Sequence, residues 1–490
     1  MSATPILSGF HPDPSICRVG DDYFLVTSSF EYVPGVPVFV SRDLVNWRQI
    51  GNVLERSSQL SVRAGITGAS GGIYAPSLRH HDGRFWMTTT SVHDVAGGHL
   101  IVHADDAAGP WSDPVRTAGL IGIDPDLSWD DEGVCRLTWS DVVRGGISQA
   151  DIDPFSGAVV SEVRQLWGGT GGAHAEGPHL VRRGRWWYLL VAEGGTGPGH
   201  TVTVARSRTP RGPFESNPAN PILTHRSTSD AVQSTGHADL VELADGTWAL
   251  VHLGTRPRGS FPRWHTNGRE TFLAGVDWVD DWPVVDESRF VVEPGSAGFD
   301  DEFLAVALNP RWVSPGVDPH LFAESGERGL ILSAGRGHDS TDAVHLLCAR
   351  AVDEYWSAQV WTKDDLALSV RIDDRHQVII ERVGEEAVVR VVIGPIEQAV
   401  ARTAVPQGSV VLEIRSEPFD APRGVPSGPD RLVLGWVADG GFRELASLDG
   451  RYLSTEVAGG FTGRVIGLEA IGRDAHVTRF RYRPSEGGEG

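Results

Sequence analysis

Five short segments of this chain share a pattern that places three carboxylates and a histidine at equivalent positions. In each segment a leading residue, usually followed by Pro, precedes an aliphatic residue, a Gly-containing turn and a run of aromatic or aliphatic residues. The leading residues are Asp13, Ala75, Asp124, Glu176 and His237, and the fourth segment carries one extra Gly. Because repeats bring equivalent positions together, we expect these residues to meet in space. Carboxylates and a histidine gathered in one place favour a catalytic site.

Carboxyl groups on opposite sides of one bond are what the hydrolysis of a glycosidic bond requires. One donates a proton to the leaving oxygen, and the other acts as a base on water or as a nucleophile. Burial or a neighbouring carboxylate must raise the pKa of the acid so that it stays protonated near neutral pH. Asp13, Asp124 and Glu176 supply all three groups. Taken singly, each Asp-Pro or Glu-Gly-Pro is better explained as a turn that begins a strand; their shared register is what favours chemistry.

The elements that position these residues are predicted to be hairpins. Each segment is typical of a strand, a tight Gly turn and a second strand. The leading residues lie about 50–60 positions apart, which is close to the length of one β-propeller blade. We therefore predict a five-bladed β-propeller over residues 1–293, with the leading residues around its central axis.

A second domain is predicted after a Pro- and Gly-containing linker at positions 293–298. The chain has 490 residues, which is too many for one core of ordinary size. Residues 299–490 show short alternating strands without the blade period, for example at 329–333, 389–393 and 465–470, which favours a concanavalin-like β-sandwich. Positions 418–430 are typical of a long loop. No long stretch has helical periodicity, so the predicted fold class is all-β.

Composition limits the classes of partner. Lys and Arg number 43 against 64 Asp and Glu, a net charge of −21, which argues against nucleic acid and is compatible with a neutral sugar. No apolar run is long enough to span a bilayer, so no membrane association is expected. The N-terminal sequence lacks the features of a signal peptide, and the three cysteines lack zinc spacing. We therefore expect a cytoplasmic protein with buried thiols.

The five segments together resemble glycoside hydrolase family 43. The matching stretches read HPDPSICRVGDDYF, GIDPDLSWDD, AEGPHL, TGHADLVE and GRETFLA, and they are most similar to the β-xylosidases and α-L-arabinofuranosidases of the family. Residues 220–225 and 460–463 also resemble the β-xylosidases that carry a C-terminal sandwich. The resemblance implies a five-bladed propeller, hydrolysis with inversion at the anomeric carbon, and no required cofactor.

The resemblance also implies roles for the three carboxylates. Asp13 is expected to be the general base and Glu176 the general acid. Asp124 is expected to orient Glu176 and to raise its pKa. An inverting reaction with these roles requires a separation of about 6.5–9.5 Å between the two catalytic carboxyl groups.

The expected sugar-binding residues are Phe30, Tyr74, Ile123, His237 and Arg269. By the resemblance, His237 lies on the axis beneath the sugar, in a region that holds a calcium ion or water in some members. Arg269 offers a donor fork to the terminal sugar, although its position alone favours a salt bridge with the adjacent Glu or another acid. Similar β-xylosidases have Trp at the position of Tyr74 and Phe at that of Ile123. Both positions are expected to line the sugar pocket, so these two differences leave the preferred sugar open.

The predicted function is that of an inverting exo-acting glycoside hydrolase that releases terminal pentose from an oligosaccharide. β-D-xylose from xylo-oligosaccharides is favoured, and α-L-arabinofuranose from arabinose-decorated oligosaccharides is the alternative. A non-catalytic sugar-binding propeller is the alternative from another class, and the three carboxylates argue against it. A polar axis argues against a protein-interaction scaffold. The sequence leaves the choice between a monomer and a homo-oligomer open.

Overall fold

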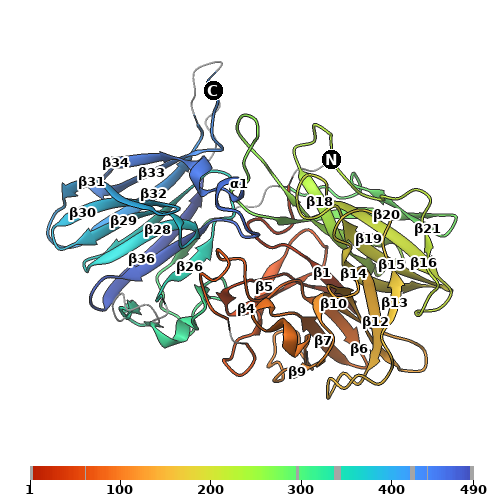
Figure 1. Cartoon of the computed structure of the whole chain (residues 1–490). Helices are drawn as coiled ribbons and strands as arrows, with labels where there is room; N and C mark the ends of the chain where they lie inside the picture. The colour runs from red at the N-terminus through yellow and green to blue at the C-terminus, as the bar shows by residue number, and fades with distance from the viewer. Residues whose placement is uncertain are drawn as a thin grey trace.

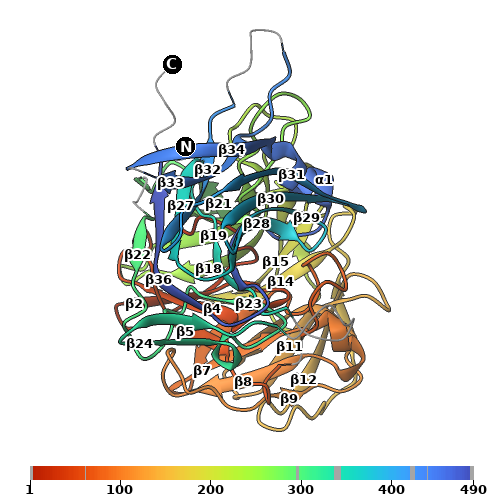
Figure 2. The same cartoon turned by 90° about the vertical axis from the view of Figure 1, so that its left-hand side faces the viewer.

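The computed structural model describes residues 4–60, 62–293, 297–335, 344–419, 425–438 and 440–485. Within these residues strands dominate, and the single α-helix, α1 (Thr455–Ala458), is only one turn long. No helix among them has the length and apolar character needed to cross a membrane. Figures 1 and 2 show two β-rich bodies, one coloured red to green and the other mostly blue. The predicted all-β class is confirmed.

The N-terminal body consists of five four-stranded antiparallel sheets, here called blades one to five. Blade one contains β1 (Ser15–Val19), β2 (Asp22–Val26), β4 (Gly35–Ser41) and β5 (Arg48–Leu54). Blade two contains β6 (Ser77–His81), β7 (Arg84–Thr89), β8 (Leu100–Ala104) and β9 (Val115–Arg116). Blade three contains β10 (Gly122–Trp129), β11 (Cys135–Asp141), β12 (Ile147–Ile152) and β13 (Arg164–Trp167). Blade four contains β14 (Glu176–Arg183), β15 (Trp186–Glu193), β16 (Thr201–Ser207) and β17 (Glu215–Ser216). Blade five contains β18 (Gln233–Glu242), β19 (Trp248–Thr255), β20 (Glu270–Val279) and β21 (Trp282–Asp286).

The blades are arranged in a ring. The first strand of each blade contacts the first strand of the next, in the order β1, β6, β10, β14 and β18, and β18 contacts β1. The turn between the first two strands of every blade holds a Gly with positive φ, a conformation that other residues adopt at a cost; these are Gly20, Gly83, Gly133, Gly184 and Gly246. The recurrent Gly turns therefore form hairpins whose first strands surround one axis, as in a propeller.

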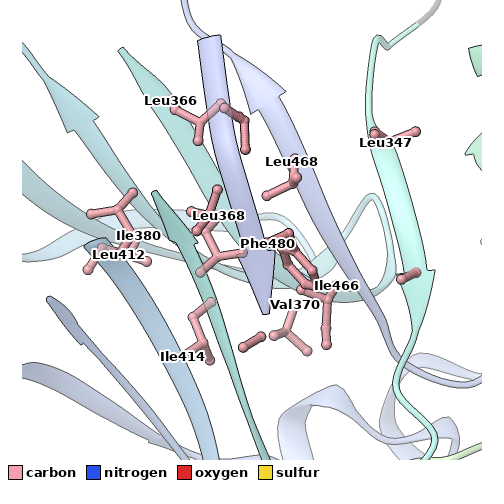
Figure 3. Close-up of a cluster of buried hydrophobic side chains, with 14 of the residues drawn as sticks. Leu347, Leu366, Leu368, Val370, Ile380, Leu412, Ile414, Ile466, Leu468 and Phe480 are labelled. Carbon is pink, nitrogen blue, oxygen red and sulfur yellow. The ribbon is translucent and has the colours of Figure 1, made fainter. Parts of the chain in front are cut away.

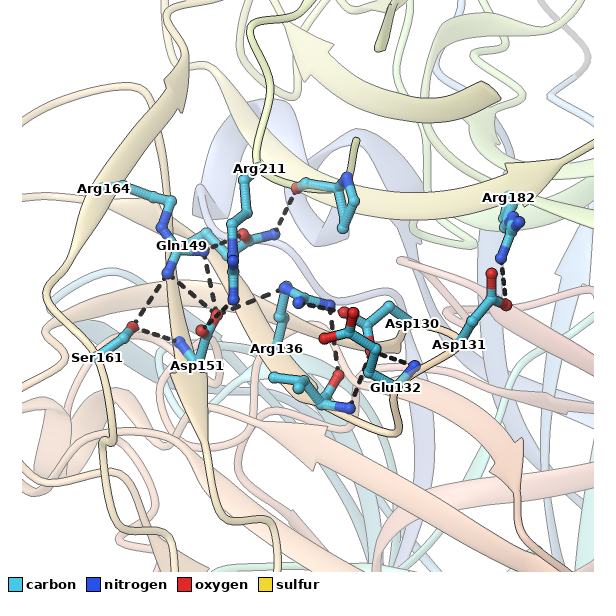
Figure 4. Close-up of polar contacts among 12 residues, drawn as sticks. Asp130, Asp131, Glu132, Arg136, Gln149, Asp151, Ser161, Arg164, Arg182 and Arg211 are labelled. Atoms are coloured by element: carbon cyan, nitrogen blue, oxygen red, sulfur yellow. Dashed lines mark hydrogen bonds and ion pairs between the residues drawn. The ribbon is translucent and has the colours of Figure 1, made fainter. Parts of the chain in front are cut away.

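Ion pairs connect blades three and four (Figure 4). Asp151 of β12 is 10% exposed and accepts from Arg164 of its own blade at 3.1 Å and from Arg211 of blade four at 2.8 Å. Arg182 of β14 pairs with Asp131 in the turn of blade three. Because Asp151 is largely shielded from water, its contacts are screened less than those of exposed pairs. These ion pairs help to fix blade three, which carries Asp124, against blade four, which carries Glu176.

The described residues of the C-terminal body form two sheets. The eight-stranded sheet contains β22 (Phe299–Asp301), β24 (Ala323–Gly326), β25 (Gly329–Leu332), β27 (Trp356–Thr362), β32 (Val410–Glu417), β33 (Arg431–Ala438), β34 (Gly441–Asp449) and β36 (Ala475–Pro484). The six-stranded sheet contains β26 (Leu347–Arg350), β28 (Leu366–Asp373), β29 (His376–Val383), β30 (Glu386–Ile393), β31 (Ile396–Ala404) and β35 (Val465–Ala470). Side chains from both sheets, among them Leu368, Ile414 and Phe480, form one buried cluster (Figure 3). This is the arrangement of a β-sandwich.

The strands predicted for the second domain are present. They correspond to β25, to the end of β30 and to β35. The central part of the predicted linker, residues 294–296, lies outside the described residues, as do residues 420–424 of the predicted loop. The three cysteines are buried and free, as predicted.

The two bodies are joined by paired strands and buried polar contacts. β3 (Tyr32–Val33) of the propeller pairs with β23 (Ser314–Pro315) at the start of the second body. Arg371 lies 3.2 Å from Glu31, and both side chains are almost fully buried. Arg350 donates to the backbone oxygen of Phe10 at 3.1 Å. Such contacts hold the sandwich against the end of the propeller from which Phe30 and Glu31 extend.

Candidate active site

A pocket of about 240 Å³ lies at one end of the propeller axis. It receives residues from all five blades and one residue from the sandwich. Its lining is Asp13, Phe30, Tyr74, Ala75, Ile123, Asp124, His174, Glu176, Gly195, Thr196, His237, Arg269 and Phe461. Every site residue predicted from the sequence is in this lining. The pocket is smaller than the roughly 300–1,000 Å³ typical of drug-sized ligands, so its size suits a single sugar ring.

The leading residues of the repeats have an unusual backbone. Asp13, Asp124 and His237 have φ values of 56°, 54° and 47°. Few residues other than Gly adopt this left-handed conformation, and it is associated with functional sites. In blades three and five the strand register is interrupted just at this residue. The interruption turns each leading side chain toward the axis instead of leaving it in the plane of the sheet.

Glu176 does not occupy the leading position, and the sequence prediction is wrong here by one residue. In blade three the register break lies between Ile123 and Asp126, and in blade four it lies between Glu176 and His179. Glu176 is therefore equivalent to Ile123, and Gly177, with φ 58°, is equivalent to Asp124. The extra Gly takes the left-handed conformation at no steric cost. This shift places the carboxyl group of Glu176 at the wall position that Ile123 occupies in blade three.

Asp13 is held in its charged form. Burial alone would raise its pKa, but Arg269, His237 and Ser28 outweigh burial, and the net pKa is lowered. Arg269 Nη1 donates to Asp13 Oδ1 at 3.0 Å, and Ser28 Oγ donates to Oδ2 at 2.5 Å. His237 Nδ1 lies 3.5 Å from Oδ1. A buried carboxylate with these partners is ready to accept a proton from water.

Glu176, in contrast to Asp13, has a raised pKa and favours its protonated form. Burial and the negative charge of Asp13 raise its pKa to about 7, although Arg269 opposes them. Burial and the charges of Glu176 and Asp13 also raise the pKa of Asp124, which accepts from Gly177 N–H at 3.1 Å. Because their charged forms repel each other, Asp124 and Glu176 as a pair resist the loss of their last proton. Glu176, the more exposed of the two, can deliver that proton to a ligand in the pocket.

His237 contributes a neutral imidazole to the base of the pocket. Burial lowers its pKa to about 4, against the attraction of Asp13. A Cβ placed on Gly177 would lie 2.9 Å from the His237 ring, so the missing side chain at 177 leaves room for it. His237 is therefore a hydrogen-bonding surface and not a second charge on the axis.

Arg269 forms a salt bridge and also faces the pocket. The acid that pairs with Arg269 is Asp13. The adjacent Glu270 pairs instead with Arg256 at 2.6 Å. Arg269 Nη1 also donates to Thr196 Oγ1 at 3.0 Å. Its Nε is buried and has no hydrogen-bond partner in the described part of the chain. A guanidinium fixed on one side in this way can bind ligand hydroxyls on the other.

Aromatic rings form the apolar side of the pocket. Phe30 and Tyr74 meet edge to face, with 5.8 Å between ring centroids. Phe461 of the sandwich stacks on Phe30 at 6.2 Å and lies under the Arg269 guanidinium, 5.2 Å away. Ile123 lines the same pocket. Sugar rings pack well on such surfaces because their C–H faces are apolar while their edges carry hydroxyl groups.

Four lining residues were missed from the sequence: His174, Gly195, Thr196 and Phe461. Phe461 lies in a stretch that resembled sandwich-bearing enzymes, but nothing in its local sequence placed it beside the propeller axis. Thr196 follows a Gly pair and has no repeat equivalent that would single it out. These residues lie in loops, where spacing gives no register.

His174 belongs to a loop that leads into Glu176. The loop is anchored by Glu193, a buried carboxylate of β15 that accepts from the backbone N–H groups of Thr170 at 2.9 Å and Gly172 at 2.9 Å. His174 itself is exposed and has φ 53°. The anchoring carboxylate therefore fixes the approach of the chain to the acid residue.

The residues around His237 do not fit a calcium ion. Calcium takes six to eight oxygen ligands. The nearest carboxylate above, Asp13, is bound by Arg269, and the carboxylates below, Asp126 and Asp239, are bound by Arg79 at 2.6 and 2.7 Å. In the described residues no group of three or more His, Cys, Asp or Glu is placed to hold a metal ion. No step proposed below involves a metal.

Together, the pocket offers a charged carboxylate, a protonated carboxyl group, a guanidinium and aromatic surfaces around a space of monosaccharide size. This combination can activate water at one side of a bound ring and protonate a leaving oxygen at another.

Comparison with known proteins agrees with this chemistry. Residues 2–283 match the model of glycosyl hydrolases family 43. A non-reducing end alpha-L-arabinofuranosidase from Bacteroides ovatus is 35% identical, over 96% of this chain and 91% of its own length. A xylan 1,3-beta-xylosidase from a Vibrio species is 41% identical, over 71% of this chain and 69% of its own length.

Solved structures extend the likeness to both bodies. The Bacteroides ovatus xyloglucan-locus GH43B structure superposes with a TM-score of 0.87 at 34% identity, covering 98% of this chain and 99% of that one. A xylan beta-1,4-xylosidase from Bacillus halodurans superposes with a TM-score of 0.83 at 29% identity, covering 98% and 99%. The arrangement of propeller and sandwich is therefore shared over nearly the whole length.

Proposed function

This chain belongs to glycosyl hydrolases family 43, and from that premise we propose that it is an inverting exo-acting glycosidase that releases terminal β-D-xylose from xylo-oligosaccharides. The observation that carries the proposal is one small pocket in which a charged Asp13 faces a Glu176 whose pKa is raised to about 7. The two carboxyl groups differ in protonation at the same pH, which is the requirement for an acid and a base.

In the proposed reaction, Asp13 accepts a proton from a water molecule, and that water attacks the anomeric carbon. Glu176 donates its proton to the glycosidic oxygen as the bond to the leaving sugar breaks. Attack and departure occur on opposite faces of the ring, so the configuration at the anomeric carbon inverts. The steps use side chains and water alone.

Asp124 and Arg269 support these two roles. Asp124 lies beside Glu176, and a charge on either carboxyl group favours the protonated form of the other, because two adjacent carboxylates repel. Arg269 keeps Asp13 charged and directs its remaining donors at the hydroxyl groups of the terminal sugar. His237 offers a neutral hydrogen-bonding group beneath the ring.

The exo mode follows from the size of the pocket and from the residues that close it. Arg269, Phe30 and Phe461 lie together on one side, with the guanidinium 5.2 Å from the Phe461 ring. A chain passing through the pocket would have to displace this cluster. We therefore propose that only a terminal residue of the substrate enters.

Release of α-L-arabinofuranose is the second candidate. Tyr74 and Ile123 form a wall less suited to a flat xylose ring than Trp and Phe would be. A relative with 35% identity over nearly the whole chain is named as an arabinofuranosidase. These two observations favour activity on both sugars.

Nitrophenyl glycosides test the proposal directly. We expect hydrolysis of the β-D-xyloside and of the α-L-arabinofuranoside, and no cleavage within long xylan chains. NMR of the first-formed sugar is expected to show the inverted anomer. Sugar binding without turnover would indicate the non-catalytic sugar-binding propeller, and a retained anomer would point to a covalent intermediate.

A further inference from the structure

A second ring of polar side chains lies on the axis directly below the catalytic layer. In four blades these residues come two positions after the residue with positive φ. They are Ser15 after Asp13, Asp126 after Asp124, His179 after Gly177 and Asp239 after His237. Blade two contributes Arg79 from β6. Each blade thus supplies one side chain to this ring, and Arg79 is the only Arg or Lys among the five.

The guanidinium of Arg79 contacts the other four members. Nη2 lies 2.6 Å from Asp126 Oδ1, and Nη1 lies 2.7 Å from Asp239 Oδ2. Nη1 also donates to Ser15 Oγ at 3.1 Å, and Nη2 donates to His179 Nδ1 at 2.9 Å. One planar cation therefore joins the first strands of all five blades, which a single-point charge such as Lys could not do with the same geometry.

The ring is also fixed to the backbone of the strands. Asp239 Oδ2 accepts from Ser15 Oγ at 2.8 Å and from Ile16 N–H at 3.0 Å. Asp126 Oδ2 accepts from Leu180 N–H at 2.8 Å. The two aspartate side chains are fully buried, so they depend on Arg79 for compensation of their charge.

Arg79 separates two cavities along the axis. The catalytic pocket lies above it. A hollow of about 360 Å³ lies below, lined by first-strand residues that include Ile16, Leu127 and Leu180, and Arg79 is part of its lining. The Arg79 side chain is 15% exposed, so solvent reaches it from the lower hollow.

Two histidines lie between the ring and the catalytic base. Because Arg79 cannot accept a hydrogen bond, His179 Nδ1 must accept, and the His179 proton lies on Nε2. The rings of His179 and His237 are 6.1 Å apart, and His237 Nδ1 lies 3.5 Å from Asp13. Arg79 also donates to Ser15, which is two residues from Asp13 in the same segment, so a displacement of Arg79 is expected to shift Asp13.

We propose that Arg79 is a built-in axial cation: its guanidinium occupies the place that a metal ion would take, holds one strand of each blade, and so positions Asp13 and the acid pair above it. Arg79 is a positioning residue, since it acts through the strands and does not touch the sugar. The proposal rests on the proposed function for its activity readout, but its metal readout is independent of the substrate.

The test replaces Arg79 by Ala and measures the response to CaCl₂. Loss of the guanidinium leaves the carboxylates of Asp126 and Asp239 and the hydroxyl of Ser15 as oxygen ligands, completed by water, around a space open to the lower hollow. We expect kcat to fall about 100-fold, with KM changed less than about threefold, because a small displacement of reacting groups is costly. We expect Tm to fall by about 10 °C. Millimolar CaCl₂ should raise the Tm of this variant by about 5 °C and recover part of kcat, since calcium binds only the folded state.

Three comparisons accompany this variant. The wild type should keep its Tm and kcat in CaCl₂ and in EDTA. Arg18→Ala, which removes the same charge from the wall of the same hollow, should leave kcat unchanged and show no calcium response. Arg79→Lys keeps the charge without the fork, so its kcat should fall about tenfold, again without a calcium response. This variant also serves if the Ala variant does not fold.

Several results would overturn the proposal. One is calcium binding to the wild-type axis, seen as a calcium-dependent Tm. Others are a wild-type kcat in Arg79→Lys, or an Arg79→Ala variant that loses stability and gains no response to calcium. If the proposed substrate is wrong, wild type and variants are all inactive on it, while the calcium comparison still decides whether Arg79 replaces a metal.

Discussion

At the scale of single residues, the site depends on two carboxyl groups that experience different surroundings. Asp13 is deeply buried, yet its pKa is lowered because Arg269, His237 and Ser28 stabilise its charge. Glu176 is less buried, yet its pKa is raised to about 7 because burial and Asp13 disfavour its charge. Burial alone would therefore predict the wrong assignment. The partners of each group decide which is the base and which is the acid.

The first prediction separates the two roles. Replacing Glu176 by Ala removes the proton donor, so activity on a xylo-oligosaccharide should fall about 10²–10⁴-fold. On a nitrophenyl xyloside, whose leaving group needs little protonation, the loss should be less than about tenfold. Asp13→Ala should lose a similar large factor on both substrates, because water must still be activated. Steady-state kinetics on the two substrates measure this, and equal losses for both variants on both substrates would contradict the assignment.

The second prediction concerns pH. Glu176 acts in its protonated form, so kcat/KM should decline as pH rises through its pKa of about 7. Asp124→Asn removes a negative neighbour and so lowers the pKa of Glu176. The alkaline limb of the pH–rate profile should move about one unit toward lower pH. An alkaline limb that stays in place would show that Asp124 does not control the acid.

The third prediction concerns the sugar. Tyr74 and Ile123 line the pocket, and Tyr74 adds a hydroxyl that Trp would lack. The double variant Tyr74→Trp with Ile123→Phe enlarges the flat apolar wall, so we expect a higher ratio of xylosidase to arabinofuranosidase activity. The ratio of kcat/KM on the two nitrophenyl glycosides measures this preference. An unchanged ratio would mean that other residues set specificity.

At the scale of strands, the repeat pattern predicts much of the site because each hairpin brings its leading residue to the axis. The five hairpins and the clustering of Asp13, Asp124 and His237 follow from spacing and from the Gly turns. The register of Glu176 does not follow, because sequence letters do not show which residue of a Glu-Gly pair takes the left-handed conformation. Blade four resolves this by assigning positive φ to Gly177.

The fourth prediction tests that strand geometry. Gly177→Ala forces a side chain into a left-handed residue, where its Cβ would lie 2.9 Å from the His237 ring. The backbone cost alone is about 1–2 kcal/mol, and relief of the contact must move His237 or Glu176. We expect lower Tm together with a fall in kcat of at least about tenfold.

Gly184→Ala is the matched control for this variant. Gly184 lies in the turn that follows the same strand, β14, and also has a positive φ of 57°. A Cβ added to Gly184 would have no neighbouring atom within 4 Å. The control should lose stability by about the same backbone cost and keep its kcat. A full loss of activity in both variants would trace the effect to unfolding and not to the site.

At the scale of the whole molecule, the pocket is completed by a domain that starts after the propeller ends. Phe461 reaches the pocket because its backbone N–H donates to Ser70 Oγ at 2.8 Å, and Arg464 N–H donates to the Thr266 backbone oxygen at 2.9 Å. The sequence predicts two domains but not this contact, since no periodicity relates a sandwich loop to a propeller axis. Contacts between residues this distant in the chain depend on the packing of both domains.

The last prediction asks what the sandwich contributes to the reaction. Phe461 stacks on Phe30, meets Tyr74 edge to face at 6.1 Å and supports the Arg269 guanidinium. Its removal in Phe461→Ala opens one side of the sugar pocket and frees Arg269 to move, so KM on the nitrophenyl xyloside should rise about tenfold or more. Because Asp13 keeps its contacts with Ser28 and His237, kcat should fall by a smaller factor than KM rises. Phe442→Ala, on the outer strand β34 of the same sandwich, controls for damage to that domain and should leave KM unchanged. If KM stays at the wild-type value in Phe461→Ala while Tm falls, the sandwich stabilises the propeller without forming part of its binding site.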